Sequence, residues 1–314
     1  MTRTAERPQA FAYAPVTPPG RLPPLWAMPL ILIGLIAGGA LLMWGVTLVV
    51  GTWADLTGRH VDLIAAQSWP AQLLVSVLFL GSLGGLTLFW VRRFEHRPLS
   101  TAGLAWPRAA DLAPWLAGAV FAAGVGLWLA GGAPSTPVTG PGGLGAVFAA
   151  IALLIVTAAI VLAFGAVEEL VLRGWALSVL SPKLGVGWAL GITSVLFGMA
   201  HVPPSDWAEP ARLIGFAGFT AMGVAFGAVA LARRSLWSSI ALHGGYNFAF
   251  AALAAVQAGF NPAEMVQGAM GGGSGFGDLT TALTLAVAQL VMAVAAVLWW
   301  RFRPTPPASP ESVF

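Results

Sequence analysis

The apolar stretch G-A-V-F-A-A-I-A-L-L-I-V-T-A-A-I-V-L-A-F-G-A-V-E at 145–168 sets the fold class of this chain. Its only ionisable side chain is the last one, Glu168, and every other residue is apolar, Gly or Thr. A helix needs about 20 apolar residues to cross the hydrocarbon core of a bilayer. The stretch therefore predicts a membrane-spanning helix.

Seven further stretches allow the same interpretation: 26–50, 70–91, 112–131, 185–201, 211–231, 235–255 and 279–300. The chain of 314 residues is 58% hydrophobic and only 9% charged, whereas soluble proteins carry about 25% charged residues. The absence of cysteine excludes disulfides, thiolate metal ligands and a cysteine nucleophile. We predict an all-α, polytopic transmembrane bundle of about eight spans.

The basic residues predict the orientation of this bundle. With the N-terminus in the cytoplasm, 13 of the 15 Lys and Arg residues fall on the inner side, and only Arg59 and Arg212 fall outside. This bias follows the positive-inside rule and predicts that both termini are cytoplasmic. Because the positive charges lie at membrane edges, the net charge of +3 does not indicate a nucleic-acid partner. The expected surroundings are a lipid bilayer, the cell membrane if the source is bacterial.

Composition divides the chain into five parts. Residues 1–24 are rich in proline and predict a flexible cytoplasmic tail, as do residues 304–314. Spans one to three occupy 25–142, a core of four spans occupies 143–256, and 257–303 hold a Gly-rich outer loop and the last span. The connections at 134–143 and 271–277 have turn composition and are expected to be linkers.

Three short blocks place ionisable side chains in or beside predicted spans. They read E-E-L-V-L-R at 168–173, F-G-M-A-H at 197–201 and H-G-G-Y-N at 243–247. A charge near the bilayer centre costs roughly 2.5–3.5 kcal/mol on insertion scales, so such residues rarely persist without a task. The combination of carboxylates, imidazoles and an amide predicts a buried site that handles water or a proton.

Helical geometry divides the first block. Glu168 and Glu169 point about 100° apart on a helix, so we do not expect both to face one cavity. Glu169 precedes Arg173 by four residues, the favourable order for an ion pair within a helix. We expect this pair to be structural and Glu168 to face the bundle interior. The alternative is that all three residues mark the cytoplasmic end of the fourth span.

The other two blocks each place two side chains on one helical face. Phe197 and His201 are one turn apart, so the aromatic ring can shield the imidazole and hold its orientation. His243 and Asn247 share a face in the same way, and Gly244 and Gly245 between them would allow another helix or a peptide backbone to approach closely. The alternative is that both histidines are structural.

Two chemistries suit a carboxylate beside two imidazoles. The carboxylate can act as a general base toward water, or the three groups can hold a metal that lowers the pKa of bound water. An amide and an imidazole can stabilise an oxyanion. Ser194 and Ser235 leave open a serine–histidine pair as in rhomboid proteases. A proton-coupled transporter and a non-catalytic scaffold are the remaining alternatives.

The order E-E-x-x-x-R, F-x-x-x-H, H-x-x-x-N resembles the CAAX-protease and bacteriocin-processing (CPBP) family, which includes the type II CAAX prenyl endopeptidases. The resemblance covers about 145–255, and it implies an intramembrane endopeptidase acting on a membrane-associated peptide of CAAX or leader type. Glu168 and His201 would then activate water, and His243 and Asn247 would stabilise the oxyanion. Glu169, Arg173 and Phe197 would support the site. The family is described both as zinc-type metalloproteases, for which the ligands here would be Glu168, His201 and His243, and as metal-free.

The depths of these residues in the bilayer do not agree if each helix is straight and upright. Counted from Lys183, Glu168 lies 15 residues before and His201 lies 18 residues after, whereas His243 lies only nine beyond Arg234. At about 1.5 Å per residue the depths differ by roughly 10 Å. A tilt, or a fourth helix that continues well into the cytoplasm, would bring them together.

Overall fold

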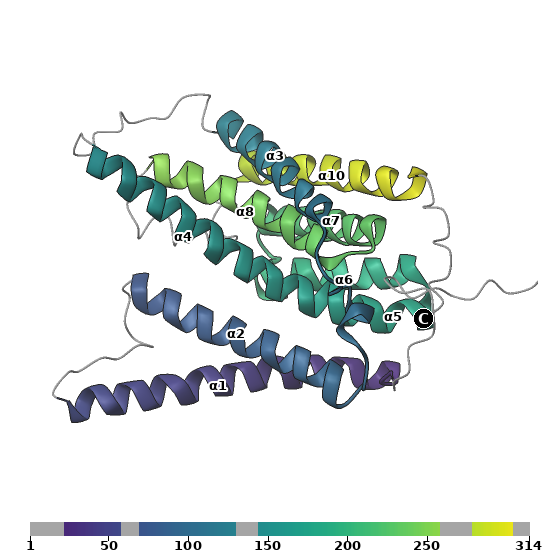
Figure 1. Ribbon diagram of the computed structural model, residues 1–314. Coiled ribbons are helices and arrows are strands. Elements are labelled where there is room, and N and C mark those ends of the chain that lie inside the picture. Colours follow the sequence, from purple (N-terminus) through teal and green to yellow (C-terminus); the bar gives the residue numbers. More distant parts are fainter. Residues whose placement is uncertain (1–21, 58–68, 130–143, 258–277, 304–314) are drawn as a thin grey trace, which may run out of the picture.

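A computed structural model describes residues 22–57, 69–129, 144–257 and 278–303. Within these ranges the chain is helical and has no strand, which confirms the all-α class. The α-helices are α1 (Met28–Leu56), α2 (Trp69–Arg93), α3 (Ala113–Leu129), α4 (Leu144–Glu169), α5 (Leu177–Leu184), α6 (Val186–His201), α7 (Pro210–Arg233), α8 (Leu236–Gln257) and α10 (Leu279–Phe302) (Figure 1). The predicted linkers at 134–143 and 271–277, and nearly all of both predicted tails, lie outside the described residues, and the predicted division into five parts stays a prediction.

Six helical segments are long and apolar enough to cross a membrane by length and composition. They are Leu25–Leu56, Leu73–Arg93, Ala109–Leu129, Ile151–Leu184, Pro210–Arg233 and Leu279–Phe302. The six do not include α6, which has 16 residues, or α8. A helix stands at each of the eight predicted spans, but the number that cross and the side of the termini stay predictions.

Apolar side chains cover the outside of the bundle as well as its inside. In α1, Leu41 is 67% exposed, Trp53 is 59% exposed and Val49 is 69% exposed. A helix that is hydrophobic all round needs apolar surroundings on every face. Hydrocarbon chains provide those surroundings, so the outer faces fit contact with lipid.

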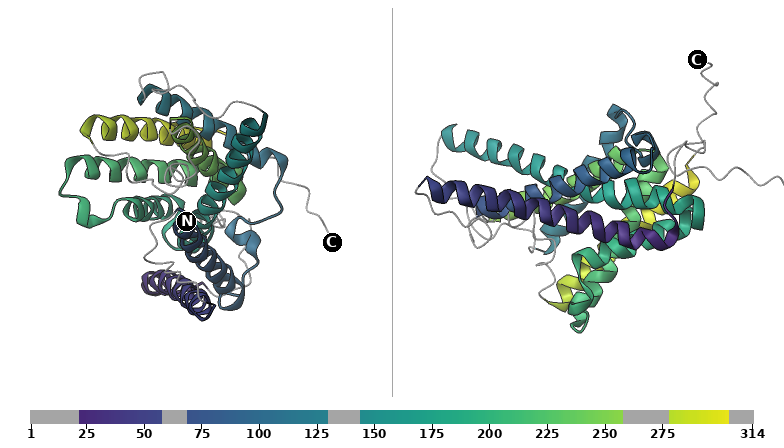
Figure 2. Two further views of the ribbon diagram at one scale, coloured as in Figure 1. Left: turned by 90° about the vertical axis from the view of Figure 1, so that its left-hand side faces the viewer. Right: turned by 90° about the horizontal axis from the view of Figure 1, so that it is seen from below.

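Helix α7 lies at the centre of the bundle. Of its most apolar window 61% is buried, against 11–33% for the other candidate spans. It packs against α6, α8 and α10, while α3 and α4 pack on α8. Helices α1 and α2 form a pair along the lower edge of Figure 1 that joins the rest through α2, and Figure 2 shows the same arrangement from two further sides.

Glycines allow α3 and α8 to approach each other very closely. A Cβ atom on Gly245 would lie 2.0 Å from the carbonyl oxygen of Trp115, and one on Gly118 would lie 2.3 Å from that of Leu242. Any side chain there would force the backbones apart. The close approach predicted at Gly244 and Gly245 is therefore present, and α3 is the helix that makes it.

The fourth helix does not end near residue 168, where the predicted span ends. Helix α4 continues through a π-helical segment, η4 (Leu170–Ala176), into α5, so the helical run ends only at Leu184. Glu169 and Arg173 are fully buried and paired inside the bundle. Because their charges are compensated there, the helix can continue past them. The three charges therefore do not mark a helix end, and Glu168 lies well inside the run.

Candidate active site

Three helices bring one carboxylate and two imidazoles together. Glu168 near the end of α4, His201 at the end of α6 and His243 in α8 meet around one atom. Oε2 of Glu168 lies 3.8 Å from Nε2 of His201 and 3.8 Å from Nε2 of His243. That oxygen is buried and has no hydrogen-bond partner. The long α4–η4–α5 run satisfies the condition under which the depths of these residues agree.

Both glutamates reach the same imidazole, contrary to the expectation that they could not share a cavity. Nδ1 of His243 lies 3.1 Å from Oε1 of Glu169, while Nε2 faces Glu168. The two nitrogens are on different edges of the ring, so one ring can bridge side chains that diverge on one helix. The ring stacks on Phe226 at 4.4 Å and lies against Gly165, where a Cβ would be 3.2 Å from its Cγ.

Glu169 is the centre of a fully buried network. The predicted ion pair is present, with Nη1 of Arg173 at 3.0 Å from Oε1 of Glu169. Ser239 donates to Oε2 of the same carboxylate, and Arg173 donates to the carbonyl of Gly223 at 2.9 Å. The buried ion pair therefore has partners from α7, through Arg173, and from α8, through Glu169, as charges away from water require.

His201 is held by its own helix and by two aromatic rings. Its Nδ1 lies 2.9 Å from the carbonyl oxygen of Phe197. The imidazole lies 4.3 Å from the ring of Phe197 and 4.4 Å from that of Phe219, measured between centroids. The shielding expected from Phe197 is therefore present, and Phe219 of α7 adds a second face. Nε2 is left pointing toward Glu168.

Asn247 lies one turn beyond His243 on α8 and is half-buried. None of the hydrogen bonds within the described residues uses its side chain. An amide presents two N–H donors and one acceptor. Its donors are thus free for a group that enters beside His243.

The protonation pattern leaves the centre of the site without a donor. A carboxylate and a carbonyl oxygen can only accept, so Nδ1 carries the proton in both His243 and His201. When a ring carries only this proton, its Nε2 atom has a lone pair directed at Glu168. Three acceptor atoms around one point call for a donor, and a water molecule has the size and the two protons to supply it.

A tetrahedral zinc ion does not fit the three side chains as they stand. Ligand atoms about 2.1 Å from zinc would lie roughly 3.4 Å from one another, but both pairs that include Glu168 are 3.8 Å apart. Among the residues that the structure describes, no group of three or more His, Asp or Glu could hold a metal ion. We therefore derive no chemical step through a metal.

The serine–histidine alternative gains no support from the contacts. Ser194 is fully buried and donates to Leu190 in its own helix at 2.7 Å. Ser235 is also buried, and within the described part of the chain neither hydroxyl bonds a histidine. The serine that does join the network, Ser239, bonds Glu169 instead.

Four site residues were not singled out from the sequence: Gly165, Phe219, Phe226 and Ser239. Ser239 precedes His243 by four residues on α8, and that spacing could have indicated it. The two phenylalanines lie among many apolar residues of α7, where nothing distinguishes them. Gly165 precedes Glu168 by three residues, but only the packed structure shows that an imidazole lies against it.

The family comparison agrees with this geometry. Residues 147–249 match the family described as Rce1-like, type II CAAX prenyl endopeptidase Rce1-like. This stretch, about a third of the chain, is similar to the CAAX-protease family. The match runs from α4 into α8 and includes Glu168, His201, His243 and Asn247, so the resemblance seen in the three blocks is confirmed. No curated protein matches the chain. The apolar helices and the family match support an integral membrane protein, and the matched family is one of peptide hydrolases.

Proposed function

We propose that this protein is an intramembrane endopeptidase that cleaves a membrane-associated peptide with a water molecule activated by Glu168. The observation that carries the proposal is the buried, unpartnered Oε2 of Glu168 between two imidazole nitrogens. A buried acceptor without a partner is costly unless it has a task. The family match supports peptide hydrolysis as that task.

In the first step Glu168 acts as general base. A water between Oε2 of Glu168 and Nε2 of His201 gives a proton to the carboxylate while its oxygen attacks the scissile carbonyl carbon. His201 accepts a hydrogen bond from the second water hydrogen, which stays on the oxygen, and so fixes the direction of the oxygen lone pair. Positioned general bases contribute roughly 10²–10⁴-fold to the rate.

Stabilisation of the oxyanion falls to His243 and Asn247. For Nε2 of His243 to donate, the ring must carry a second proton. The carboxylate of Glu169, 3.1 Å from Nδ1, accepts the hydrogen bond from that nitrogen and holds the ring in this orientation. The unengaged amide of Asn247 supplies the second donor. Donors of this kind act only as charge develops on the oxygen, which lowers the barrier rather than binding substrate.

In the second step Glu168 returns its proton to the leaving nitrogen. The carbon–nitrogen bond breaks, and one water is consumed for each peptide bond. The products are a carboxylic acid and an amine. The side chains of Glu168 and His201 are 33% and 19% exposed, whereas that of His243 is 2% exposed. Substrate is therefore expected to enter from the side of Glu168 and His201.

The substrate class we propose is a membrane-anchored peptide, such as a prenylated CAAX end or a leader segment. The family description supports the CAAX class, and the lipid-facing helices place the enzyme where such an anchor resides. A farnesylated CAAX peptide and the same peptide without its prenyl group distinguish whether the anchor is required.

The Glu168→Gln variant tests the mechanism. Gln keeps the shape of the side chain but cannot accept the proton, so we expect cleavage of a membrane-associated reporter peptide to fall roughly 100-fold or more. The Glu209→Gln variant is the matched control, because Glu209 is 75% exposed in a weak pair with Arg212. It should cleave at the wild-type rate, and both variants should unfold at the wild-type temperature.

Cleavage at the wild-type rate by purified Glu168→Gln protein would rule the mechanism out. The zinc alternative is tested by measuring the metal content of the same samples and by treating them with 1,10-phenanthroline. If the chelator abolishes cleavage and one equivalent of zinc restores it, the side chains rearrange around a metal. Flux in proteoliposomes that depends on His243, without cleavage, would favour the transporter alternative.

A further inference from the structure

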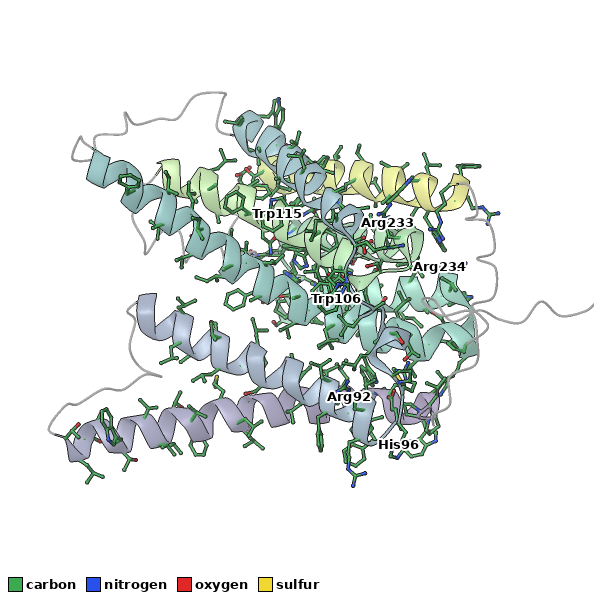
Figure 3. All side chains as sticks on the ribbon, in the orientation of Figure 1. Arg92, His96, Trp106, Trp115, Arg233 and Arg234 are labelled. Atoms are coloured by element: carbon green, nitrogen blue, oxygen red, sulfur yellow. The ribbon has the colours of Figure 1, made fainter. Side chains whose placement is uncertain are left out.

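A group of arginines lies at one end of the bundle and takes no part in the proposed chemistry. Helices α7 and α10 pack along each other and end on the same side. Arg233 is the last residue of α7, Arg234 follows it, and Arg303 follows the last residue of α10. Figure 3 shows Arg233 and Arg234 together at this end, apart from Arg92 of α2. We call Arg108, Arg233, Arg234 and Arg303 the arginine cluster.

The charges of the cluster are only partly balanced. Asp111 is buried and pairs with Arg108 at 3.1 Å and with Arg233 at 3.6 Å. Within the described residues no carboxylate pairs with Arg234 or Arg303. Of the four guanidinium groups, two therefore pair with a described carboxylate, and it is the same one.

The remaining arginines are held close to one another. Burial, followed by the positive charges of Arg234 and Arg233, lowers the pKa of Arg303. The guanidinium Nε of Arg233 is buried and has no hydrogen-bond partner. Arg108 donates to the carbonyl of Arg233 at 3.1 Å, which ties the loop before α3 to the end of α7. A bound anion would reduce the repulsion between these guanidinium groups and would accept a hydrogen bond from Nε of Arg233.

The fold holds Arg234 in place at a cost. Its φ of 50° is left-handed, a conformation that is uncommon for residues other than glycine. Helix α8 begins at Leu236, two residues after Arg234, and His243 lies seven residues further, or about 10 Å along the helix. The arginine cluster is therefore distinct from the proposed active site.

We propose that the arginine cluster binds the phosphate headgroup of an anionic phospholipid. The cluster stands where two helices that can cross a membrane end, which is the depth of lipid phosphates. Arginine presents its donors in a planar fork that matches phosphate. Basic pockets between helices at the membrane edge bind anionic lipid headgroups.

An exposed aromatic ring favours a lipid over an acidic peptide as the occupant. Trp106 precedes Arg108 and is 92% exposed, and tryptophan is enriched at headgroup depth. The neighbouring Trp237 bonds the carbonyl of Ala105 at 2.7 Å and anchors this loop to α8. An anion carried on acyl chains can contact both the arginines and the apolar surface beside them.

Native mass spectrometry of the full chain in detergent tests the site. The protein is supplied with equal amounts of phosphatidylglycerol and phosphatidylcholine, and bound lipids are counted. We expect the wild type to retain phosphatidylglycerol preferentially. The Arg234→Gln/Arg303→Gln variant should bind it roughly tenfold more weakly, as expected when arginines near the membrane surface are lost. The measurement does not depend on proteolysis.

The Arg92→Gln/Arg93→Gln variant is the matched control, because both side chains are exposed at the end of α2 and the change of net charge is the same. It should keep the preference for phosphatidylglycerol. The Arg234→Lys/Arg303→Lys variant retains the charge and should keep the preference too, and it replaces the Gln variant as the test if that variant does not fold. Equal losses in the two Gln variants would overturn the proposal in favour of unspecific attraction. Displacement of the lipid by an equal concentration of glycerol phosphate would overturn it in favour of a free anion.

Discussion

At the scale of single residues, His243 explains why two neighbouring glutamates both belong to the site. Glu168 and Glu169 diverge on α4, but the imidazole from α8 lies between them and uses one nitrogen for each. Glu169 is therefore both the partner of Arg173 and the residue that orients His243. Its role is positioning, since the carboxylate with the unpartnered oxygen between the two imidazoles is that of Glu168.

The Glu169→Gln variant is predicted to lose stability as well as activity. Breaking one half of a fully buried ion pair leaves Arg173 uncompensated and costs about 3–5 kcal/mol. Thermal unfolding in detergent measures the loss, and cleavage of the reporter peptide measures the effect on orientation. Glu168→Gln should differ from it, because it should lose cleavage activity but keep the unfolding temperature of the wild type. An unfolding temperature for Glu169→Gln equal to that of the wild type would contradict the network.

At the scale of elements, the π-helical segment η4 keeps the site and the following helix in one run. Its Trp175 is fully buried and donates to Glu95 at 2.7 Å. Glu95 also accepts from Arg97, which reaches Ser178 of α5. π-Helical turns often occur at functional sites. Here the π-helical segment lies directly after Glu168 and Glu169. Its Trp175 and the following Ser178 of α5 are both joined to the Glu95–Arg97 pair.

The contact of α3 with α8 makes a second prediction at this scale. In Gly245→Ala the new methyl group would lie 2.0 Å from a backbone oxygen of Trp115, so the helices must separate. Overpacking of this kind costs about 1–3 kcal/mol or more. Gly124→Ala in α3 is the control, since its Cβ would meet nothing within 4 Å. A comparison of unfolding temperatures should show a loss only in Gly245→Ala, and equal values would refute the close contact.

At the scale of the whole molecule, the prediction of eight spans can be tested because the chain contains no cysteine. Trp106 and Ser205 are both exposed and fall on opposite sides of the predicted bundle. A membrane-impermeant maleimide applied to intact cells should label Ser205→Cys but not Trp106→Cys. Both should react after the membrane is permeabilised. Labelling of both in intact cells would show that the number of spans between them is even.

Local features of the chain predicted part of the fold and site. The ion pair of Glu169 with Arg173 and the contact of Phe197 with His201 follow from helical spacing, because residues four apart share a face. The end of the fourth helix could not be predicted in this way. Whether the helix can continue past two buried charges depends on Ser239 and Gly223, which come from other helices.

Hydropathy and helical spacing determined the all-α class and the positions of the helices and pointed to the candidate site residues, because both are properties of neighbouring residues in the chain. The meeting of Glu168, His201 and His243 was settled only when α4, α6 and α8 packed together. Their convergence depends on how glycines and aromatic rings far apart in the chain allow those helices to approach. No local pattern contains that information, and for the same reason the arginine cluster appears only where α7 and α10 end side by side.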